Sequence, residues 1–270
     1  METGFAFTDI PMPARQTKPR TEGLTMMIDW GIPIGHQEDL IQSQGLYVDE
    51  AKIAGPIPRV LPRNLLERKI ALYQGAGCLA FPGGLFAELA LAQGNYDKFL
   101  EEARGLGFGA IEVSDNILEI SLEDKARAIR TAARDFDLKV MGEVGKKEGV
   151  MTREELIADV ENCLEAGAAG VLLEAHELFH GDIRRDDIEA LIARVPLEKI
   201  MFELPVTALP DVTKSYKYRI LFWLVKTFGT EVNLANVEWD EVYFTEITRL
   251  GASGESSHPE GAYARAGMGG

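Results

Sequence analysis

The sequence has few cysteines and no long hydrophobic run, and these shortages exclude two classes of protein. Cys78 and Cys163 are too few for a disulfide framework, and neither has a nearby cysteine or histidine at a metal-ligand spacing. The longest uninterrupted apolar run, Ile220 to Val225, is too short to cross a membrane. The N-terminus lacks the basic segment and apolar stretch of a signal peptide. We therefore expect a cytoplasmic protein with no membrane partner.

Basic residues are scarce relative to acidic ones. The chain has 28 lysines and arginines against 43 acids, which gives a formal net charge of -15. Such a chain repels a phosphate backbone, so we expect no nucleic-acid partner. Its 270 residues and its hydrophobic content of 46% are sufficient to bury one large core.

Short apolar segments alternate with amphipathic segments along most of the chain. The former have the length of strands, and the latter carry apolar residues at helical spacings. The predicted strands are Leu24 to Asp29, Val48 to Ile53, Cys78 to Phe81, Ala110 to Val113, Lys139 to Glu143, Gly170 to Glu174, Ile200 to Glu203 and Val232 to Asn236. The clearest predicted helices are Tyr96 to Leu106, Leu122 to Phe136, Arg153 to Ala166 and Ile188 to Val195.

Several residues indicate where domains and helices begin and end. Residues 1–20 hold three prolines and residues 252–270 are rich in glycine, serine and alanine, so we expect loose ends around a single domain at 21–251. Ser121 and Thr152 each precede an acid by three residues, which is typical of helix N-caps. The positions at which helices should stop are Gly105, Gly107 and Gly167.

A glutamate closes four consecutive predicted strands at nearly constant intervals. Glu112, Glu143, Glu174 and Glu203 follow one another at steps of 31, 31 and 29 residues, about the length of one strand plus one covering helix. In a closed parallel barrel the strand ends share one mouth, so these acids should converge there on a metal or an acid-base centre. A doubly wound open sheet fits the alternation almost as well, but no Gly-x-Gly-x-x-Gly opens the first helix. We therefore predict an α/β fold, a (βα)8 TIM barrel.

Each candidate side chain also has a purely structural interpretation. Any single inward glutamate can pair with a neighbouring lysine or arginine above the core. Strand alternation puts Lys147 on the face of Glu143 and turns Lys146 away, yet Lys147 also fits a solvated loop. His176 shares the face of Glu174, although packing explains it equally. Asp29 fits ligand contact, a helix cap or the positioning of a backbone amide.

Five segments of the sequence resemble the phosphosulfolactate synthase family, from about Lys18 to Gly251. The segments are Gly23-Leu24-Thr25 leading to Ile28-Asp29, Pro82-Gly83-Gly84-Leu85-Phe86, Glu112-Val113-Ser114-Asp115, Glu143-Val144-Gly145-Lys146-Lys147 and Val232-Asn233-Leu234-Ala235-Asn236. The resemblance implies a (βα)8 enzyme that uses Mg²⁺ to add sulfite to C3 of phosphoenolpyruvate through an enediolate, which needs fixed positive charge. Small anionic substrates and a homo-oligomer are then expected.

The resemblance also implies roles for particular residues. Lys147 matches the family's catalytic lysine and is our candidate general acid, with Glu143 and Glu112 as further catalytic groups. The expected metal ligands are Glu112, Glu143, Glu174 and Glu203. The expected substrate-binding residues are Asp29, Lys52, Arg59, Asp115, Lys146, His176, Glu177 and Asn236.

The sequence departs from the family pattern in three loops. The family's Lys-Phe-Gly-Trp-Gly-Thr, Glu-Gly-Arg-Glu-Ser-Gly and Ala-Pro-Gln-Lys-Ser give way here to Lys52-Ile53-Ala54-Gly55, Glu174-Ala175-His176-Glu177-Leu178-Phe179 and Leu204-Pro205-Val206. Basic and polar groups at the mouth thus become neutral or apolar. Three hypotheses follow: the parent reaction, with Lys52, Arg59 and Lys147 replacing the lost charge; the same chemistry on a bulkier or less charged enol or with another nucleophile; and a non-catalytic, stress-associated barrel that acts through partners.

Overall fold

Eight parallel strands form a nearly closed barrel in the computed structural model, which describes residues 4–146, 149–179 and 182–267. The strand order is β3-β2-β1-β8-β7-β6-β5-β4, and the Gly109 amide donates to Ala80 O (3.3 Å) across the seam between β3 and β4. The strands are β1 Thr25–Asp29, β2 Glu50–Ile53, β3 Leu79–Pro82, β4 Ala110–Val113, β5 Lys139–Val144, β6 Gly170–Leu173, β7 Ile200–Glu203 and β8 Asn233–Val237. The predicted TIM-like barrel is confirmed.

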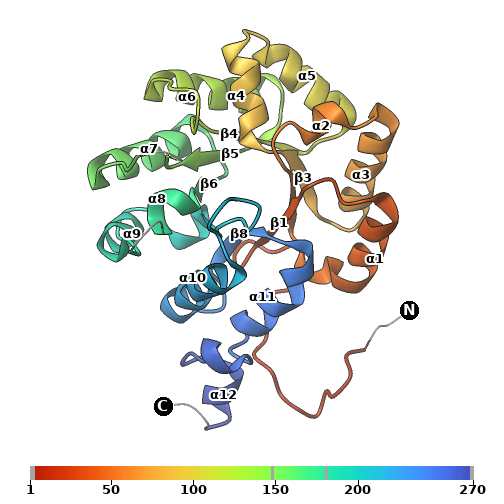
Figure 1. The fold of residues 1–270 in the computed structure, drawn as a ribbon, viewed down its shortest axis with the longest axis vertical. Coiled ribbons are helices and arrows are strands. Elements are labelled where there is room, and N and C mark those ends of the chain that lie inside the picture. Colours follow the sequence, from red (N-terminus) through yellow and green to blue (C-terminus); the bar gives the residue numbers. More distant parts are fainter. Residues whose placement is uncertain (1–3, 147–148, 180–181, 268–270) are drawn as a thin grey trace.

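Helices surround the barrel (Figure 1). The α-helices are α1 Ile34–Gln44, α2 Ile57–Val60, α3 Arg63–Gly75, α4 Gly84–Ala92, α5 Tyr96–Leu106, α6 Leu122–Arg130, α7 Arg153–Ala166, α8 Ala175–Phe179, α9 Arg185–Ile192, α10 Lys214–Phe228, α11 Val242–Arg249 and α12 Ala262–Arg265. Single turns are η1 Gly45–Tyr47, η2 Thr131–Asp135 (a π-turn that continues α6), η3 Leu197–Lys199, η4 Trp239–Glu241 and η5 Gly254–Ser256. None of the described helices is long and apolar enough to cross a bilayer.

The expected helix caps form, with one exception. The Ser121 side chain accepts from the Asp124 amide (3.1 Å), and Thr152 and Glu155 form a reciprocal capping box. Gly107 and Gly167 end α5 and α7 with φ of 93° and 110°, values that favour glycine. Gly105, in contrast, lies inside α5.

The barrel interior explains where the repeated glutamates point. One buried cluster fills the barrel below the mouth: Met26, Phe81, Ala110, Met141, Leu172, Met201 and Ala235. Side chains alternate between the two faces of a strand, so the residue two positions after an inward one also points inward. Each glutamate comes two residues after a member of this cluster, and all four therefore form a polar layer above it.

Both ends of the chain contact the barrel. Arg15 pairs with Glu231 (2.7 Å) and Glu246 (3.0 Å), and at the other end the buried His258 ring lies 3.0 Å from Arg249 O. In Figure 1 the N-terminal segment and α12 extend from the same side of the barrel. These contacts show that Arg15 and His258 lie against the barrel, and the loose ends outside 21–251 stay a prediction.

Candidate active site

The four strand-end glutamates line one cavity at the carboxyl ends of the strands. The cavity has a volume of about 410 Å³, and Lys52 of β2 lies on the same floor. All four carboxylates are almost fully buried, with exposures of 2 to 6%. The sequence spacing thus led to residues that the fold brings together.

Lys52 is the buried cation between two of these acids. Its Nζ lies 2.5 Å from Glu203 Oε1 and 3.2 Å from Glu112 Oε2. Burial alone would lower the pKa of Lys52, but attraction to Glu112, Glu203 and Glu143 outweighs it and raises that pKa, so the ammonium stays charged. Burial raises the pKa of Glu112 well above its usual range, with Lys52 opposing and Glu143 reinforcing the shift.

Three of the acids can hold a metal ion. Glu143, Glu174 and Glu203 each offer an oxygen, and these oxygens all lie within 4.8 Å of one another. Oxygens on opposite sides of Mg²⁺ are about 4 Å apart, so a small movement would bring the three into coordination. A divalent ion would also neutralise carboxylates that are costly to bury together. The donor set fits a hard divalent cation without identifying it.

Backbone amides orient two of the acids. The Gly84 amide donates to Glu112 Oε1 (2.7 Å), and the His176 amide donates to Glu174 Oε1 (3.1 Å). A Cβ on Gly84 would lie 2.7 Å from Glu112 Oε1, so only glycine allows this approach. These contacts hold the floor in place at the start of α4 and α8.

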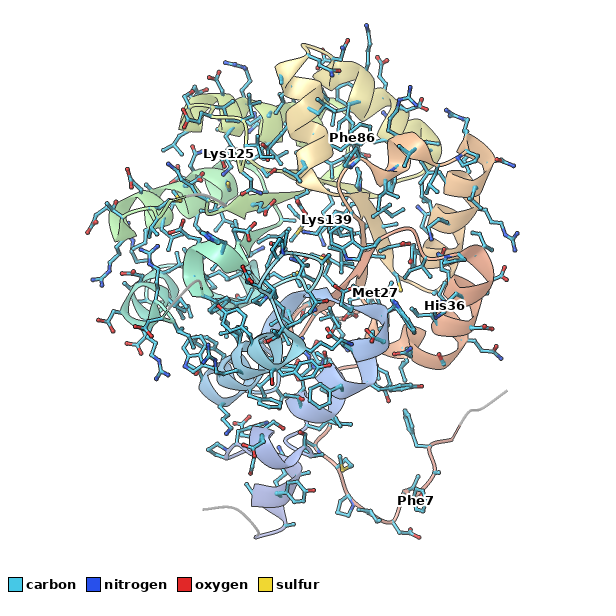
Figure 2. All side chains as sticks on the ribbon, viewed as in Figure 1. Phe7, Met27, His36, Phe86, Lys125 and Lys139 are labelled. Carbon is cyan, nitrogen blue, oxygen red and sulfur yellow. The ribbon has the colours of Figure 1, made fainter. Side chains whose placement is uncertain are left out.

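Lys125 supports Glu143 from behind and was not predicted. Its Nζ donates to Glu143 O (2.7 Å), Asp115 (2.8 Å) and Asp159 (2.7 Å), and its side chain is fully buried. Figure 2 shows Lys125 between α6 and the strands. The sequence contained an indication that Lys125 is buried. It precedes Ile129 by four residues and therefore lies on the apolar face of α6.

The expected substrate-binding residues divide into groups. Lys52, His176 and Asn236 line the cavity. Asp29 does not, because its Oδ1 accepts the amides of Gly31 and Ile32 (2.7 Å each) and its Oδ2 binds Tyr73 and Lys69. This fully buried carboxylate orients the loop after β1, which corresponds to the backbone-positioning alternative.

The other expected residues lie outside the cavity lining. Arg59 lines a separate pocket beside α3 and α5, and Asp115 pairs with Lys125. Glu177 accepts the amides of Lys146 (3.1 Å) and Met151 (2.9 Å) and pairs with Arg184, so its carboxylate holds a loop. The side chain of Lys146 is exposed. Lys147, our candidate general acid, lies outside the described residues.

One wall of the cavity is apolar, in keeping with the neutral and apolar residues that the sequence places at the mouth. It consists mainly of the segment between β7 and α10, together with Trp30 and the first turn of α10, and its members are Trp30, Leu204, Pro205, Val206, Leu209, Val212 and Tyr216. The signal was Leu204-Pro205-Val206 after β7, where an acid is followed at once by bulky apolar residues. The cavity therefore has a charged floor beside a hydrophobic wall.

Known proteins have sequences similar to most of this chain. Residues 13–255 match the family of (2R)-phospho-3-sulfolactate synthase (ComA). The phosphosulfolactate synthase of Methanocaldococcus jannaschii is 34% identical over 246 residues, covering 87% of this chain and 93% of that protein. The protein HEAT-STRESS-ASSOCIATED 32 of Arabidopsis thaliana is 27% identical over 250 residues, covering 82% of this chain and 83% of the other.

A solved structure supports the fold alone. The YdjI aldolase from Escherichia coli K12 superimposes with a TM-score of 0.52 at 9% identity, covering 92% of this chain and 89% of that one. At that identity the likeness concerns the barrel and not its chemistry. The family match instead spans residues 13–255, the range in which all four strand-end glutamates lie, and the resemblance seen in short motifs is thereby confirmed. The chain belongs to the phosphosulfolactate synthase family.

Proposed function

We propose that this chain adds sulfite, or a related nucleophile, to C3 of phosphoenolpyruvate or a similar enol. The observation that carries the proposal is a buried trio of carboxylates beside a charged lysine, at the mouth of a barrel that belongs to this family. In such a reaction the sulfur lone pair forms the C–S bond while the C2–C3 π pair moves onto the carboxylate as an enediolate. That pair then returns to take a proton at C2, and no group leaves.

The chain's own residues have distinct parts in this proposal. Glu143, Glu174 and Glu203 would hold Mg²⁺, with Glu112 beside them, and the bound ion would supply positive charge to the developing enediolate. Lys52 adds a second fixed positive charge at the floor. His176 and Asn236 line the same cavity and would bind substrate oxygens. Lys147 is assigned the proton transfer to C2 from the sequence and the family resemblance.

Turnover of phosphoenolpyruvate tests the reaction. With sulfite and MgCl2 present, we expect phosphoenolpyruvate to disappear and a new phosphate ester to appear in the ³¹P NMR spectrum without release of inorganic phosphate. Omitting sulfite or adding EDTA should stop the reaction. No turnover, together with no effect of metal on the melting temperature, would favour the non-catalytic hypothesis that the plant relative suggests.

Lys147→Ala tests the proton donor. We expect this variant to lose turnover while its melting temperature and circular dichroism stay those of the parent chain. Lys139→Ala is the matched control, since Lys139 begins β5 and pairs with Glu50 at the opposite end of the barrel. A fully active Lys147→Ala enzyme would exclude Lys147 as the acid. The expected homo-oligomer is a separate prediction, which light scattering can test.

A further inference from the structure

The cavity combines two surfaces that suit different parts of one molecule. Its floor carries Lys52 and the strand-end glutamates, whereas its wall carries Trp30, Leu209 and their apolar neighbours. Trp30 is 47% exposed and Leu209 53% exposed, although both are large hydrophobic side chains. Exposed apolar side chains at the rim of a polar cavity are typical of a ligand-binding wall.

The wall is held in place by its own contacts. The Leu204 amide donates to Ala235 O (3.0 Å) on β8, and the Leu209 amide donates to Val206 O (3.1 Å). At the end of the segment, the Thr213 side chain accepts from the Tyr216 amide (3.2 Å). The Tyr216 hydroxyl donates to Phe179 O, which ties α10 to α8. The apolar side chains are thus presented to the cavity by an ordered backbone.

Apart from the Mg²⁺ that the proposed function would place there, the described lining of the cavity offers little positive charge to a substrate. Among the described residues that line the cavity, Lys52 is the one lysine or arginine, and it already bridges Glu112 and Glu203. Phosphoenolpyruvate carries a carboxylate and a phosphate but no apolar group. It would therefore leave the wall exposed to water and gain nothing from it.

We propose that the preferred substrate is an enolpyruvate-type carboxylate whose C3 carries an apolar substituent, which lies against the wall formed by Trp30 and the segment 204–212. This inference rests on the proposed function, because the carboxylate end must bind at the floor. Sulfite would form the C–S bond at the substituted C3 and C2 would take the proton, so the atoms balance as for the simpler substrate. Phosphoenolpyruvate is then a truncated substrate, which loses the binding energy of the missing group.

Binding of two 2-oxo acids, measured by calorimetry with MgCl2, tests the inference. Pyruvate and phenylpyruvate share the carboxylate and carbonyl and differ only in the apolar group at C3. We expect phenylpyruvate to bind at least about tenfold more tightly, since a buried aromatic ring gains more than a single methylene. Equal affinity, or tighter binding of pyruvate, would overturn the proposal.

Variants separate this inference from the proposed function. Leu209→Ser should remove most of the preference for phenylpyruvate, whereas Leu89→Ser, a leucine on α4 with a similar exposure of 45%, should keep it. Oxalate probes the floor alone and should bind all three proteins equally. A preference that survives Leu209→Ser in a folded protein would overturn the wall assignment while leaving the sulfite reaction standing. If oxalate fails to bind even the parent chain, the floor does not bind a carboxylate ligand, and both proposals are wrong.

Discussion

At the scale of single residues, Lys52 is the side chain on which the charged floor depends. Its ammonium is buried between Glu112 and Glu203, and burial makes each of these charges costly without its partner. The same ammonium opposes the rise in the pKa of Glu112. One lysine therefore contributes to stability and to the proposed chemistry.

Replacing Lys52 by methionine should destabilise the fold and make its stability depend on pH. We expect a loss of about 3 kcal/mol in the free energy of unfolding, because two buried carboxylates lose their cation. Without Lys52 the pKa of Glu112 rises further, so the native state keeps a proton that the unfolded state releases above the ordinary glutamate pKa. The free energy of unfolding should therefore fall as the pH rises from the ordinary glutamate pKa to the raised pKa of Glu112. Urea denaturation over a series of pH values in EDTA can measure this fall.

The control for Lys52→Met is Arg63→Met. Arg63 pairs with Glu67 and Glu102, and all three side chains are 47 to 56% exposed, so these pairs are screened by solvent. We expect a much smaller loss of stability for this control. Equal losses in the two variants would contradict the role assigned to Lys52.

Glu177 fastens both ends of the loop that follows β5. Its two oxygens accept the amides of Lys146 and Met151, while Arg184 pairs with Glu177 and donates to Met151 O (2.9 Å). A Cβ on Gly145 would lie 2.9 Å from Glu177 Cβ, which shows how closely α8 packs against this loop. The loop carries Lys147 in the sequence, so we expect Glu177 to act as a positioning residue for the proposed acid.

Glu177→Gln should loosen the loop without removing the cavity. A glutamine has one acceptor oxygen and no charge, so we expect faster hydrogen exchange at the amides of Lys146 and Met151 and a fall in kcat larger than any rise in KM. Asp187→Asn is the control, since Asp187 also pairs with Arg184 but accepts neither amide. Unchanged exchange in Glu177→Gln would show that the loop is held by other contacts.

The sequence predicted the residues of the floor better than those around it. Glu112 and Glu174 followed from strand periodicity, which depends only on local spacing. The side chains that bind Asp29 come from α3, and Tyr73, for example, lies 44 positions later in the chain. No local sequence pattern indicates such a contact. Arg59 failed to reach the cavity for a related reason: α2 turns it toward α3 and α5, a direction that a loop sequence does not specify.

At the scale of elements, the predicted bounds of the strands nearly match the structure where turn and cap residues flank them. The predicted bounds of α5 and α7 match the structure, and both helices end at a glycine of positive φ. α9 instead begins at Arg185, three residues before the predicted start. Its N-cap residue Arg184 makes no side-chain cap hydrogen bond. The sequence feature that indicates this start is the pair of acids in the first turn, Asp186 and Asp187.

Thr152→Ala tests the cap of α7. The Thr152 side chain accepts from the Glu155 amide (3.2 Å), and the Glu155 carboxylate accepts from the Thr152 amide (2.8 Å). Losing this box should cost about 1 kcal/mol in the free energy of unfolding, measured by urea denaturation. Ser43→Ala is the comparison, because Ser43 bonds only carbonyls within α1 and caps no amide, so a clearly smaller loss is expected. Similar losses at both sites would argue against the cap as the cause.

At the scale of the whole molecule, the barrel gathers acids that the chain spaces far apart. The layer of Met26, Phe81 and their neighbours fills the barrel below the mouth, so the glutamates above it can face only the cavity. Eight-strand closure was predictable from the count of strands, and apolar residues at the mouth were visible in the sequence. The position of the apolar wall was not predictable, because it depends on how the segment after β7 folds back over the mouth. Because the closed barrel brings carboxylates from several strands together, a metal ion bound to them would stabilise the whole fold.

Divalent metal should therefore raise the melting temperature of the parent chain. A ligand that binds only the folded state at one hundred times its Kd adds about 2.7 kcal/mol, or roughly 2 to 4 °C for each kcal/mol in a large domain. Glu143→Gln replaces one of the three clustered carboxylates by a neutral amide and should abolish most of this rise. Glu50→Gln is the matched control, since Glu50 is also a strand glutamate with 2% exposure but begins β2 at the opposite end of the barrel. Differential scanning fluorimetry with MgCl2 and then EDTA compares the three proteins, and an equal rise in all of them would mean that the ion binds elsewhere.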